Sequence, residues 1–323
     1  MIRLAVIGAG QIGRRHLEAL AKIDFPAQIQ VVDPSPASLE TAKRQCLHVL
    51  ERNRHITKVE YFTNMAALDA DLDVVIVATL SNIRKRVVET LIEQKNVRYL
   101  LLEKVVFQHP EHFGQISRLL KEHHIKAWVN CPLRMYAFYH ELKSKLKGSK
   151  QIVYHVSSSD LGIGCNAIHH LDIVSFLTDD CDWQIDTSML DKQVLSSKRP
   201  GFMEFTGTFI GKLPSGSTMT VTSYPRAGVP KTTHIDSDNV KCTVQVDKAW
   251  LSESPHWSWS DIPFSRLLQS ELTHVAVRQI VMTGSCQLTT FDESRKLHIP
   301  LLRALNGHLQ KVNAWEGEAC PIT

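Results

Sequence analysis

The fold of this chain is decided at residues 2–13, which read IRLAVIGAGQIG. The mostly apolar run Ile2–Ile7 predicts a buried strand, and a G-x-G-x-x-G pattern follows it at Gly8, Gly10 and Gly13. Gly8 permits a tight turn, Gly10 lets the backbone approach a pyrophosphate, and Gly13 lets a helix pack closely on the strand. Because strand, glycine turn and helix occur in this order, the stretch predicts a dinucleotide-binding turn.

The helix after the turn begins with Gln11 and Ile12, whose N–H groups are expected to hold the pyrophosphate together with the positive end of the helix dipole. Asp33 lies 20 residues after the last glycine of the motif, at the end of a second apolar run. A carboxylate there accepts hydrogen bonds from the adenosine ribose hydroxyls. The next residues are Pro34 and Ser35, so no arginine stands ready for a 2′-phosphate. The pattern favours NAD over NADP; a glycine-rich turn that binds FAD, or nothing, is the alternative.

Apolar runs and amphipathic segments alternate through the first 128 residues. Strands are expected at Ile29–Val32, Val74–Ala78, Arg98–Leu102 and Ile125–Val129. Helices are expected at Ile12–Lys22, at Ser38–Leu50 with Ser38 as its polar cap, at Ile83–Glu93 and at Glu111–His123. Continuous apolar strands that alternate with helices are typical of a parallel, doubly wound sheet. We therefore predict an NAD(P)-binding Rossmann domain over residues 1–128.

Beyond residue 130 the pattern changes. Met203–Ile210 and Ser217–Ser223 flank the sequence LPSG at 213–216, which predicts an antiparallel hairpin. A further strand is expected at Asn239–Asp247, and helices at His169–Leu177, Phe264–Met282 and Ser294–Leu309. The expected fold class is thus α/β. An α+β domain over 129–290 with a mostly antiparallel open sheet follows the Rossmann domain, and a helical segment over 291–323 closes the chain.

Composition excludes several classes of protein. Formal net charge is +4 with no cluster of Lys and Arg, so no nucleic-acid partner is expected. No apolar run is long enough for a signal peptide or a membrane span, so no membrane partner is expected. Seven scattered cysteines, an odd number, suit a reducing compartment. These features predict a globular cytoplasmic protein.

A metal site is not expected, although the chain contains 16 histidines. There is no H-E-x-x-H and no paired C-x-x-C, the spacings that commonly mark zinc ligands. The histidines at 109 and 112 and at 123 and 124 fall on predicted helix or loop surfaces, and no further ligand residues are expected near them.

Three motifs taken together resemble one known family. The glycine turn, Glu103-Lys104 and the run His169-His170-Leu171-Asp172 are similar to motifs of the Gfo/Idh/MocA oxidoreductases, the family of glucose–fructose oxidoreductase and inositol dehydrogenase. The resemblance extends over nearly the whole chain, and Phe291–Ser294 with the helix after it resembles the family's closing segment. It implies a homodimer or homotetramer formed through the open sheet, a closing helix that packs back on the Rossmann domain, and a substrate held between the domains.

The resemblance also assigns residues near the nicotinamide. The fourth strand of the family ends in a Thr-Pro-Asn-like turn; here Thr79 and Asn82 fit it, Leu80 replaces the usual proline, and Arg84 stands where a histidine is common. The fifth strand ends in Glu-Lys-Pro in the family and in Glu103-Lys104-Val105 here, so the proline is lost. Thr79, Asn82 and Glu103 are therefore expected at the cofactor.

Lys104 resembles the catalytic lysine of the family. Oxidising a secondary alcohol needs a hydride acceptor and a base for the hydroxyl proton, and a partly desolvated lysine beside the cationic nicotinamide suits that task. His169 is expected to hydrogen-bond the reacting oxygen or relay its proton. Asp172, at i+3 on the same helix face, would orient the imidazole or contact a substrate hydroxyl. Asn130 and Arg134 fall where the family's segment entering the second domain carries an Asn or Gly and an Arg, and Arg134 is included in the expected substrate site.

The main departure lies at Cys165, where the family motif Asp-x-x-x-His-x-x-Asp has its first aspartate. A thiolate–imidazolium pair of Cys165 with His169, at i,i+4, is one reading. A small apolar thiol beside a polar contact from Asn166 is the other. Cys165 and Asn166 are both included in the expected substrate site.

The other candidate site residues can also be interpreted as purely structural. Lys104 could be a solvated lysine at a strand end, and His169 a core histidine with His170 exposed. Asp172 could be purely structural, and Arg134 could form a salt bridge instead of binding a substrate carboxylate or phosphate. The functional reading rests on these residues occurring together at family-like positions.

The resemblance implies an NAD(H)-dependent oxidoreductase that acts on a secondary hydroxyl of a sugar, inositol, sugar acid or nucleotide-linked sugar. Two alternatives stay open. In one, bound NAD oxidises the substrate transiently, so that a glycosidic bond is eliminated or hydrolysed without net redox change. In the other, the protein has lost catalysis and serves as an NAD(H)-binding sensor or assembly partner.

Overall fold

The computed structural model describes residues 1–323, which divide into two compact units. The first unit comprises Met1–Phe107, Glu111–Pro132 and Leu267–Phe291; the second comprises Gln108–Pro110, Leu133–Arg266 and Asp292–Thr323. The chain therefore leaves the first unit after Pro132 and returns to it at Leu267. None of the helices is both long enough and apolar enough to cross a membrane.

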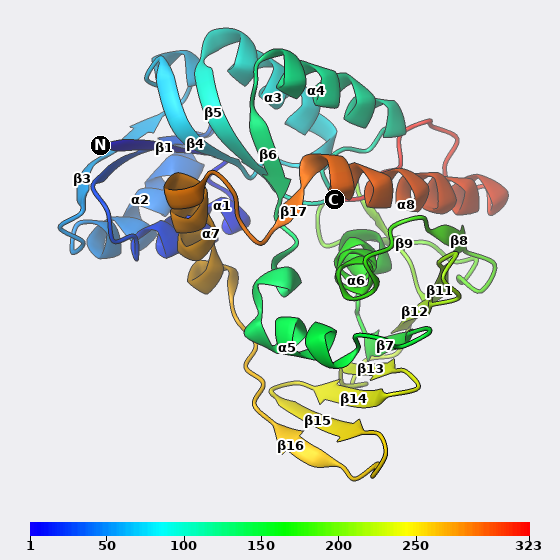
Figure 1. The fold of residues 1–323 in the computed structure, drawn as a ribbon. Helices are drawn as coiled ribbons and strands as arrows, with labels where there is room; N and C mark the ends of the chain where they lie inside the picture. Colours follow the sequence, from blue (N-terminus) through cyan, green and yellow to red (C-terminus); the bar gives the residue numbers. More distant parts are fainter. The chain divides into compact units, whose positions relative to one another are not determined.

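A seven-stranded sheet forms the centre of the first unit, in the order β17-β6-β5-β4-β1-β2-β3 (Figure 1). Its strands are β1 (Ile2–Ile7), β2 (Ala27–Val32), β3 (Ile56–Phe62), β4 (Asp71–Val77), β5 (Asn96–Leu102), β6 (Lys126–Val129) and β17 (Thr289–Thr290). All neighbours are parallel except the edge pair β17–β6. The carboxyl halves of the central strands are buried on both faces, as apolar strands between two helical layers must be. The predicted doubly wound Rossmann sheet is confirmed.

Helices cover both faces of this sheet, with α1 and α2 on one face and α3 and α4 on the other (Figure 1). The helices of the unit are α1 (Gln11–Leu20), α2 (Pro36–Leu50), α3 (Ser81–Gln94), α4 (Pro110–Glu122) and α7 (Gln269–Thr283), with a short 3-10 turn η1 (Met65–Ala67). Ser38 as the cap of α2 was a wrong prediction. The side chain of Ser35 accepts the N–H of Ser38 at 3.2 Å, because Pro36 already has the backbone angle of a first helical residue and starts the helix earlier.

The second unit contains an eight-stranded sheet in the order β16-β15-β14-β13-β7-β12-β11-β8. Its strands are β7 (Val153–Ser159), β8 (Gln184–Asp186), β11 (Gly207–Lys212), β12 (Thr218–Tyr224), β13 (Thr232–Asp236), β14 (Val240–Gln245), β15 (Lys248–Glu253) and β16 (Ser260–Ile262); β9 (Leu195–Ser196) and β10 (Met203–Glu204) form a separate pair. Its helical elements are η2 (Pro132–Met135), α5 (Ala137–Lys145), α6 (Ile163–Thr178) and α8 (Phe291–Lys311). Only β7 and β12 pair in parallel, so the mostly antiparallel sheet is confirmed.

The hairpin predicted around residues 213–216 joins β11 to β12. The first predicted strand, Met203–Ile210, is split into β10 and β11. Gly207 has a φ of +91°, and a Cβ there would lie 2.5 Å from the carbonyl oxygen of Met189. The close backbone approach therefore breaks the strand at the glycine.

One face of the second sheet is covered and the other is open. Alternate residues of β7 and β12 are buried, and α6 packs against β12. The open face carries half-buried, mainly polar side chains. It is the face on which a subunit contact is expected from the family resemblance.

The unit boundaries differ from the sequence-based ones at 128/129 and 290/291. The first unit extends to Pro132 and takes back Leu267–Phe291, because α7 packs along α1 and β17 pairs with β6. From Asp292 onward, α8 belongs to the second unit. Composition predicted neither the return of Leu267–Phe291 to the first unit nor the placing of α8 in the second, because no linker sequence marks where the chain returns.

Candidate active site

The glycine turn lies at the carboxyl end of β1. Gly8 has a φ of +100° and donates its N–H to the carbonyl of Val32 at 2.8 Å. A Cβ on Gly13 would lie 1.8 Å from the carbonyl oxygen of Gly8, so no other residue fits there. Gly10 is exposed, and a Cβ on it would meet nothing within 4 Å. The turn thus packs tightly against the strand at two glycines and leaves its outer side accessible at the third.

The start of α1 has the features of an anion site. Gly10 is the N-cap in an extended conformation, no side chain caps the helix, and its first turn carries no acidic residue. The N–H groups at Gln11 and Ile12 lie at the positive end of the helix dipole. Gln11 is exposed and Ile12 is half-buried. A pyrophosphate fits such a helix start without opposing charge.

Asp33 is placed at the end of β2, as predicted, and is half-buried. Its Oδ2 accepts the N–H of Ala9 at 2.8 Å and its Oδ1 accepts the N–H of Ser35 at 2.9 Å. The carboxylate therefore holds the glycine turn as well as standing where ribose hydroxyls are expected. A cavity follows beside α2, lined by Pro36, Leu39, Glu40, Lys43, Tyr61 and Thr63.

Two hydroxyl groups near these segments are buried and have no hydrogen-bond partner. One is Tyr61, which lines the cavity beside α2; burial, followed by the charges of Cys46 and Glu51, raises the pKa of Tyr61 to about 12. The other is Thr79, on the turn after β4. A buried hydroxyl without a partner is costly, so both are natural contacts for a polar ligand. With the open Gly10 and the uncapped α1, the residues present fit a bound dinucleotide.

The turn after β4 is fixed by Arg84 on α3. Arg84 is 2% exposed, and its guanidinium donates hydrogen bonds to the carbonyls of Thr79 and Val105 and, at 2.9 Å, to that of Val106. It thus ties the turn that bears Thr79 to the segment after Lys104. Asn82, in the first turn of α3, is exposed. The sequence marked Arg84 only as a departure from histidine; its position on the buried face of α3, four residues before Val88, was the signal for a buried role.

Glu103 and Lys104 follow β5 directly, and the Lys104–Val105 peptide bond is cis. Glu103 is 6% exposed; its Oε1 accepts hydrogen bonds from His16 Nε2 at 3.0 Å and from the Asn130 amide. Burial raises the pKa of Glu103, but the hydrogen bond and charge of His16, together with Lys104 and Asn130, outweigh it and hold the pKa below its usual value. Glu103 is therefore a buried, ionised carboxylate beside a half-buried Lys104.

Helix α6 in the second unit carries four of the predicted residues. It begins at Ile163, six residues earlier than predicted, so that Cys165 and His169 do share one helix. His169 is half-buried, whereas His170 is 2% exposed and its Nδ1 lies 2.7 Å from the Tyr154 hydroxyl. Burial holds the pKa of His170 well below its usual value, with Lys231 adding to the effect. The alternative with His169 in the core and His170 exposed was wrong.

A carboxylate stands at the start of α6 although residue 165 is not an aspartate. Glu204 accepts the N–H of Gly164 at 2.8 Å and that of Cys165 at 2.9 Å. Glu204 lies 39 residues beyond Cys165, so no local spacing connects the two residues. The Asn166 amide donates to the carbonyl of Leu161 at 2.6 Å and holds the turn before the helix.

Arg134 and Asp172 form a buried ion pair. Arg134 Nε lies 2.9 Å from Asp172 Oδ2, and the two residues are 7% and 0% exposed. Arg134 Nη1 also lies 3.2 Å from Glu293 Oε1, whose side chain is 47% exposed. Burial lowers the pKa of Arg134, but Asp172 and then Glu293 raise it more, and the pKa lies above its usual value. The pair joins η2 to α6, which favours the structural reading of both residues.

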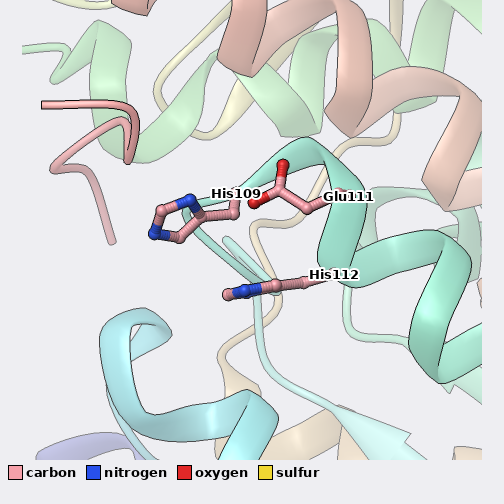
Figure 2. A group of neighbouring side chains, drawn as sticks. All are labelled: His109, Glu111 and His112. Carbon is pink, nitrogen blue, oxygen red and sulfur yellow. The ribbon is translucent and has the colours of Figure 1, made fainter.

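Three possible metal-ligating side chains occur together at the start of α4. One ligand atom from each of His109, Glu111 and His112 lies within 4.8 Å of the others, and Figure 2 shows the His109 ring on the segment before the helix and the His112 ring at the beginning of the helix. The expectation that these histidines have no ligand residue near them overlooked Glu111. Glu111 is exposed, and the His112 ring packs edge-on to Phe107 with centroids 6.2 Å apart. The positive end of the α4 dipole also opposes a cation there.

Residues 2–131 match the family model described as an oxidoreductase family with an NAD-binding Rossmann fold, Gfo/Idh/MocA. The amino-terminal domain belongs to the Gfo/Idh/MocA oxidoreductases. The resemblance stated from the glycine turn and Glu103-Lys104 is confirmed. No curated protein matches the chain significantly by sequence.

Solved structures share the fold of this chain over nearly its whole length. An oxidoreductase from Agrobacterium radiobacter, in complex with NAD+, L-tartaric acid and magnesium, gives a TM-score of 0.74 at 18% identity, covering 95% of this chain and 97% of its own. UDP-N-acetylglucosamine 3-dehydrogenase from Acidithiobacillus ferrooxidans gives 0.72 at 16%, covering 96% and 99%. Biliverdin reductase from Synechocystis sp. PCC 6803, with biliverdin and NADP+, gives 0.71 at 12%, covering 94% and 98%. At these identities the likeness establishes the fold.

Proposed function

We propose that the protein is an NAD(H)-dependent oxidoreductase that transfers hydride between the nicotinamide and a secondary hydroxyl of a carbohydrate-like substrate. The observation that carries the proposal is the placement of Lys104. It follows β5 at the carboxyl edge of a Rossmann sheet, next in sequence to a buried ionised carboxylate and on a segment that Arg84 ties to the turn after β4. Ligands of open α/β sheets bind at this edge.

NAD is the proposed cofactor, with NADP disfavoured. The glycine turn and the start of α1 would hold the pyrophosphate, Asp33 the adenosine ribose, and the turn with Thr79 and Asn82 the nicotinamide half. Asp33 supports the choice, because a carboxylate there opposes a 2′-phosphate. The domain's family is NAD-binding, and the Agrobacterium radiobacter oxidoreductase was solved with NAD+.

In the oxidation direction, Lys104 removes the hydroxyl proton and His169 hydrogen-bonds the same oxygen. The nicotinamide, when bound, supplies the hydride acceptor at its C4. Glu103 and Arg84 hold the backbone on either side of Lys104. The ion pair of Arg134 with Asp172 holds the helix that bears His169. Positioned acid–base groups of this kind contribute about 10²- to 10⁴-fold in rate.

The proposed substrates are sugars, inositols, sugar acids and nucleotide-linked sugars. UDP-N-acetylglucosamine 3-dehydrogenase, which shares the fold, acts on a nucleotide-linked sugar. Cys165 and Asn166, half-buried in the first turn of α6, are the proposed substrate contacts beside His169. We further propose a homodimer or homotetramer through the open sheet face. The cytoplasm is the proposed location, because the seven cysteines are scattered along the sequence and odd in number, which suits a reducing compartment.

The test is NADH formation at 340 nm with a panel of such alcohols. Wild type should turn over at least one of them, and Lys104→Met and His169→Asn should each lower kcat at least 100-fold. Matched controls are Lys58→Met, whose side chain is 60% exposed, and His256→Asn, also exposed; both should stay within twofold. Full turnover by the Lys104 variant would refute the mechanism. Product formed without NADH would instead indicate transient oxidation without net redox change.

A further inference from the structure

Glu103 belongs to a closed ring of polar side chains inside the first unit. We call it the polar ring; its members are His16, Glu103, Asn130, Gln269 and Thr273. His16 Nε2 lies 3.0 Å from Glu103 Oε1, and the Asn130 amide donates to the same oxygen. Asn130 Nδ2 also donates to Gln269 Oε1 at 2.9 Å. Gln269 Nε2 donates to Thr273 Oγ1 at 2.8 Å, which lies 2.8 Å from His16 Nδ1 and closes the ring.

Donors and acceptors around the polar ring are mutually consistent. The side-chain amide of Asn130 donates one N–H to Glu103 and the other to Gln269. If this amide were flipped, its oxygen would face the Glu103 carboxylate, and two acceptors would meet. His16 must carry its proton on Nε2, because a carboxylate cannot donate to it. His16 is 0% exposed, so water does not compete for these bonds. A closed and mostly buried network of this kind fixes the relative positions of its members.

The members of the polar ring come from four places that matter for function. His16 lies on α1, the helix whose start faces the proposed pyrophosphate. Glu103 immediately precedes Lys104. Asn130 lies two residues before Pro132, where the chain leaves the first unit, and Gln269 lies two residues after Leu267, where it returns. The exit and the return of the chain are therefore hydrogen-bonded to each other and to the residue beside Lys104.

We propose that His16 is a positioning residue which, through Glu103, sets the Lys104 segment relative to the cofactor helix, to the exit of the chain after Pro132 and to its return at Leu267. The catalytic lysine, the pyrophosphate helix and the chain connections at Pro132 and Leu267 then share one rigid anchor. Fixing a catalytic group through a second layer of buried side chains is a general requirement for rate. This inference rests on the proposed function, and its test separates the two.

The chain allows a matched pair of substitutions at one position. In His16→Gln the side-chain amide reaches about as far as the imidazole Nε2, so the donor to Glu103 is retained and the link to Thr273 is lost. In His16→Asn the amide reaches only as far as Nδ1, so the link to Thr273 is retained and the donor to Glu103 is lost. His48→Asn and His48→Gln, at an exposed position of α2, are the controls.

The first readout is amide hydrogen exchange over residues 103–107, measured in all five proteins with NAD titrated by calorimetry. His16→Asn should speed exchange at least tenfold in that segment while the Kd for NAD stays within threefold, and His16→Gln should stay near wild type. The second readout is kcat with whichever alcohol the wild type oxidises, which should fall at least tenfold in His16→Asn and less than threefold in His16→Gln.

The inference is overturned if His16→Asn leaves both exchange and kcat unchanged. It is also overturned if the two His16 variants lose stability and activity equally, since that pattern indicates packing alone. If the wild type oxidises none of the alcohols, the proposed function fails, and the exchange pattern still decides whether His16 holds the segment through Glu103.

Discussion

The ion pair of Arg134 with Asp172 allows a quantitative prediction. Asp172 is 0% exposed and Arg134 7%, so replacing Arg134 removes the cation beside a buried carboxylate, and replacing Asp172 leaves the buried guanidinium with the 47% exposed Glu293 as its carboxylate partner. Breaking such a pair from one side costs about 3–5 kcal/mol. Arg134→Met and Asp172→Asn should therefore each lower the free energy of unfolding by about 3 kcal/mol or more. At about 2–4 °C per kcal/mol, the midpoint of thermal unfolding should fall by about 6–20 °C.

A double-mutant cycle tests the assignment. The Arg134→Met, Asp172→Asn double variant should be at least about 2 kcal/mol more stable than the sum of the single losses predicts, because neither charge is then stranded. Glu293→Gln is the control; its side chain is 47% exposed, and exposed pairs contribute at most about 1 kcal/mol. Urea unfolding followed by circular dichroism measures the stability of the four variants and of the wild type. If each single substitution lowered the free energy of unfolding by less than about 1 kcal/mol and the two losses were additive, the structural role would be refuted. Substrate binding would then be the favoured role of Arg134.

Three further predictions follow from the first unit. Gly13→Ala should weaken NAD binding at least 100-fold in a calorimetric titration, because the added Cβ would lie 1.8 Å from the Gly8 carbonyl; an unchanged Kd would contradict the tight turn. Tyr61→Phe should leave the unliganded protein as stable or slightly more stable, since the hydroxyl has no partner, yet raise the Kd for NAD severalfold; a clear loss of stability would show that the hydroxyl is satisfied. Folding lowers the pKa of Glu103 from 4.5, so its contribution to stability is present above that pH and disappears as the pH falls through the folded pKa. Glu103→Gln should therefore flatten the plot of unfolding free energy against pH below pH 5, whereas parallel plots for variant and wild type would count against an ionised Glu103.

Local sequence predicted the parts of the fold that depend on short spacing. The glycine turn was correctly predicted because its three constraints lie within six residues and involve the backbone alone. The hairpin at 213–216 was correctly predicted for the same reason. The edge strand β3 was missed, because Ile56–Phe62 carries charged residues among its apolar ones and is only partly buried.

The contacts that organise the site join residues far apart in sequence. Thr273 lies 257 residues from His16, and Asp172 lies 38 residues from Arg134. A single sequence gives the residue types but not which buried polar group satisfies which other. The family resemblance could thus nominate Lys104 and Arg134, whereas the polar ring and the ion pair emerged only from the fold.

The most direct test of the account is a calorimetric titration of the protein, freed of any bound nucleotide, with NAD(H) and with NADP(H). NAD(H) should bind at one site per chain and NADP(H) at least tenfold more weakly, because Asp33 opposes a 2′-phosphate. Failure to bind either dinucleotide would contradict the central claim that this Rossmann unit serves a nicotinamide-dependent oxidoreductase.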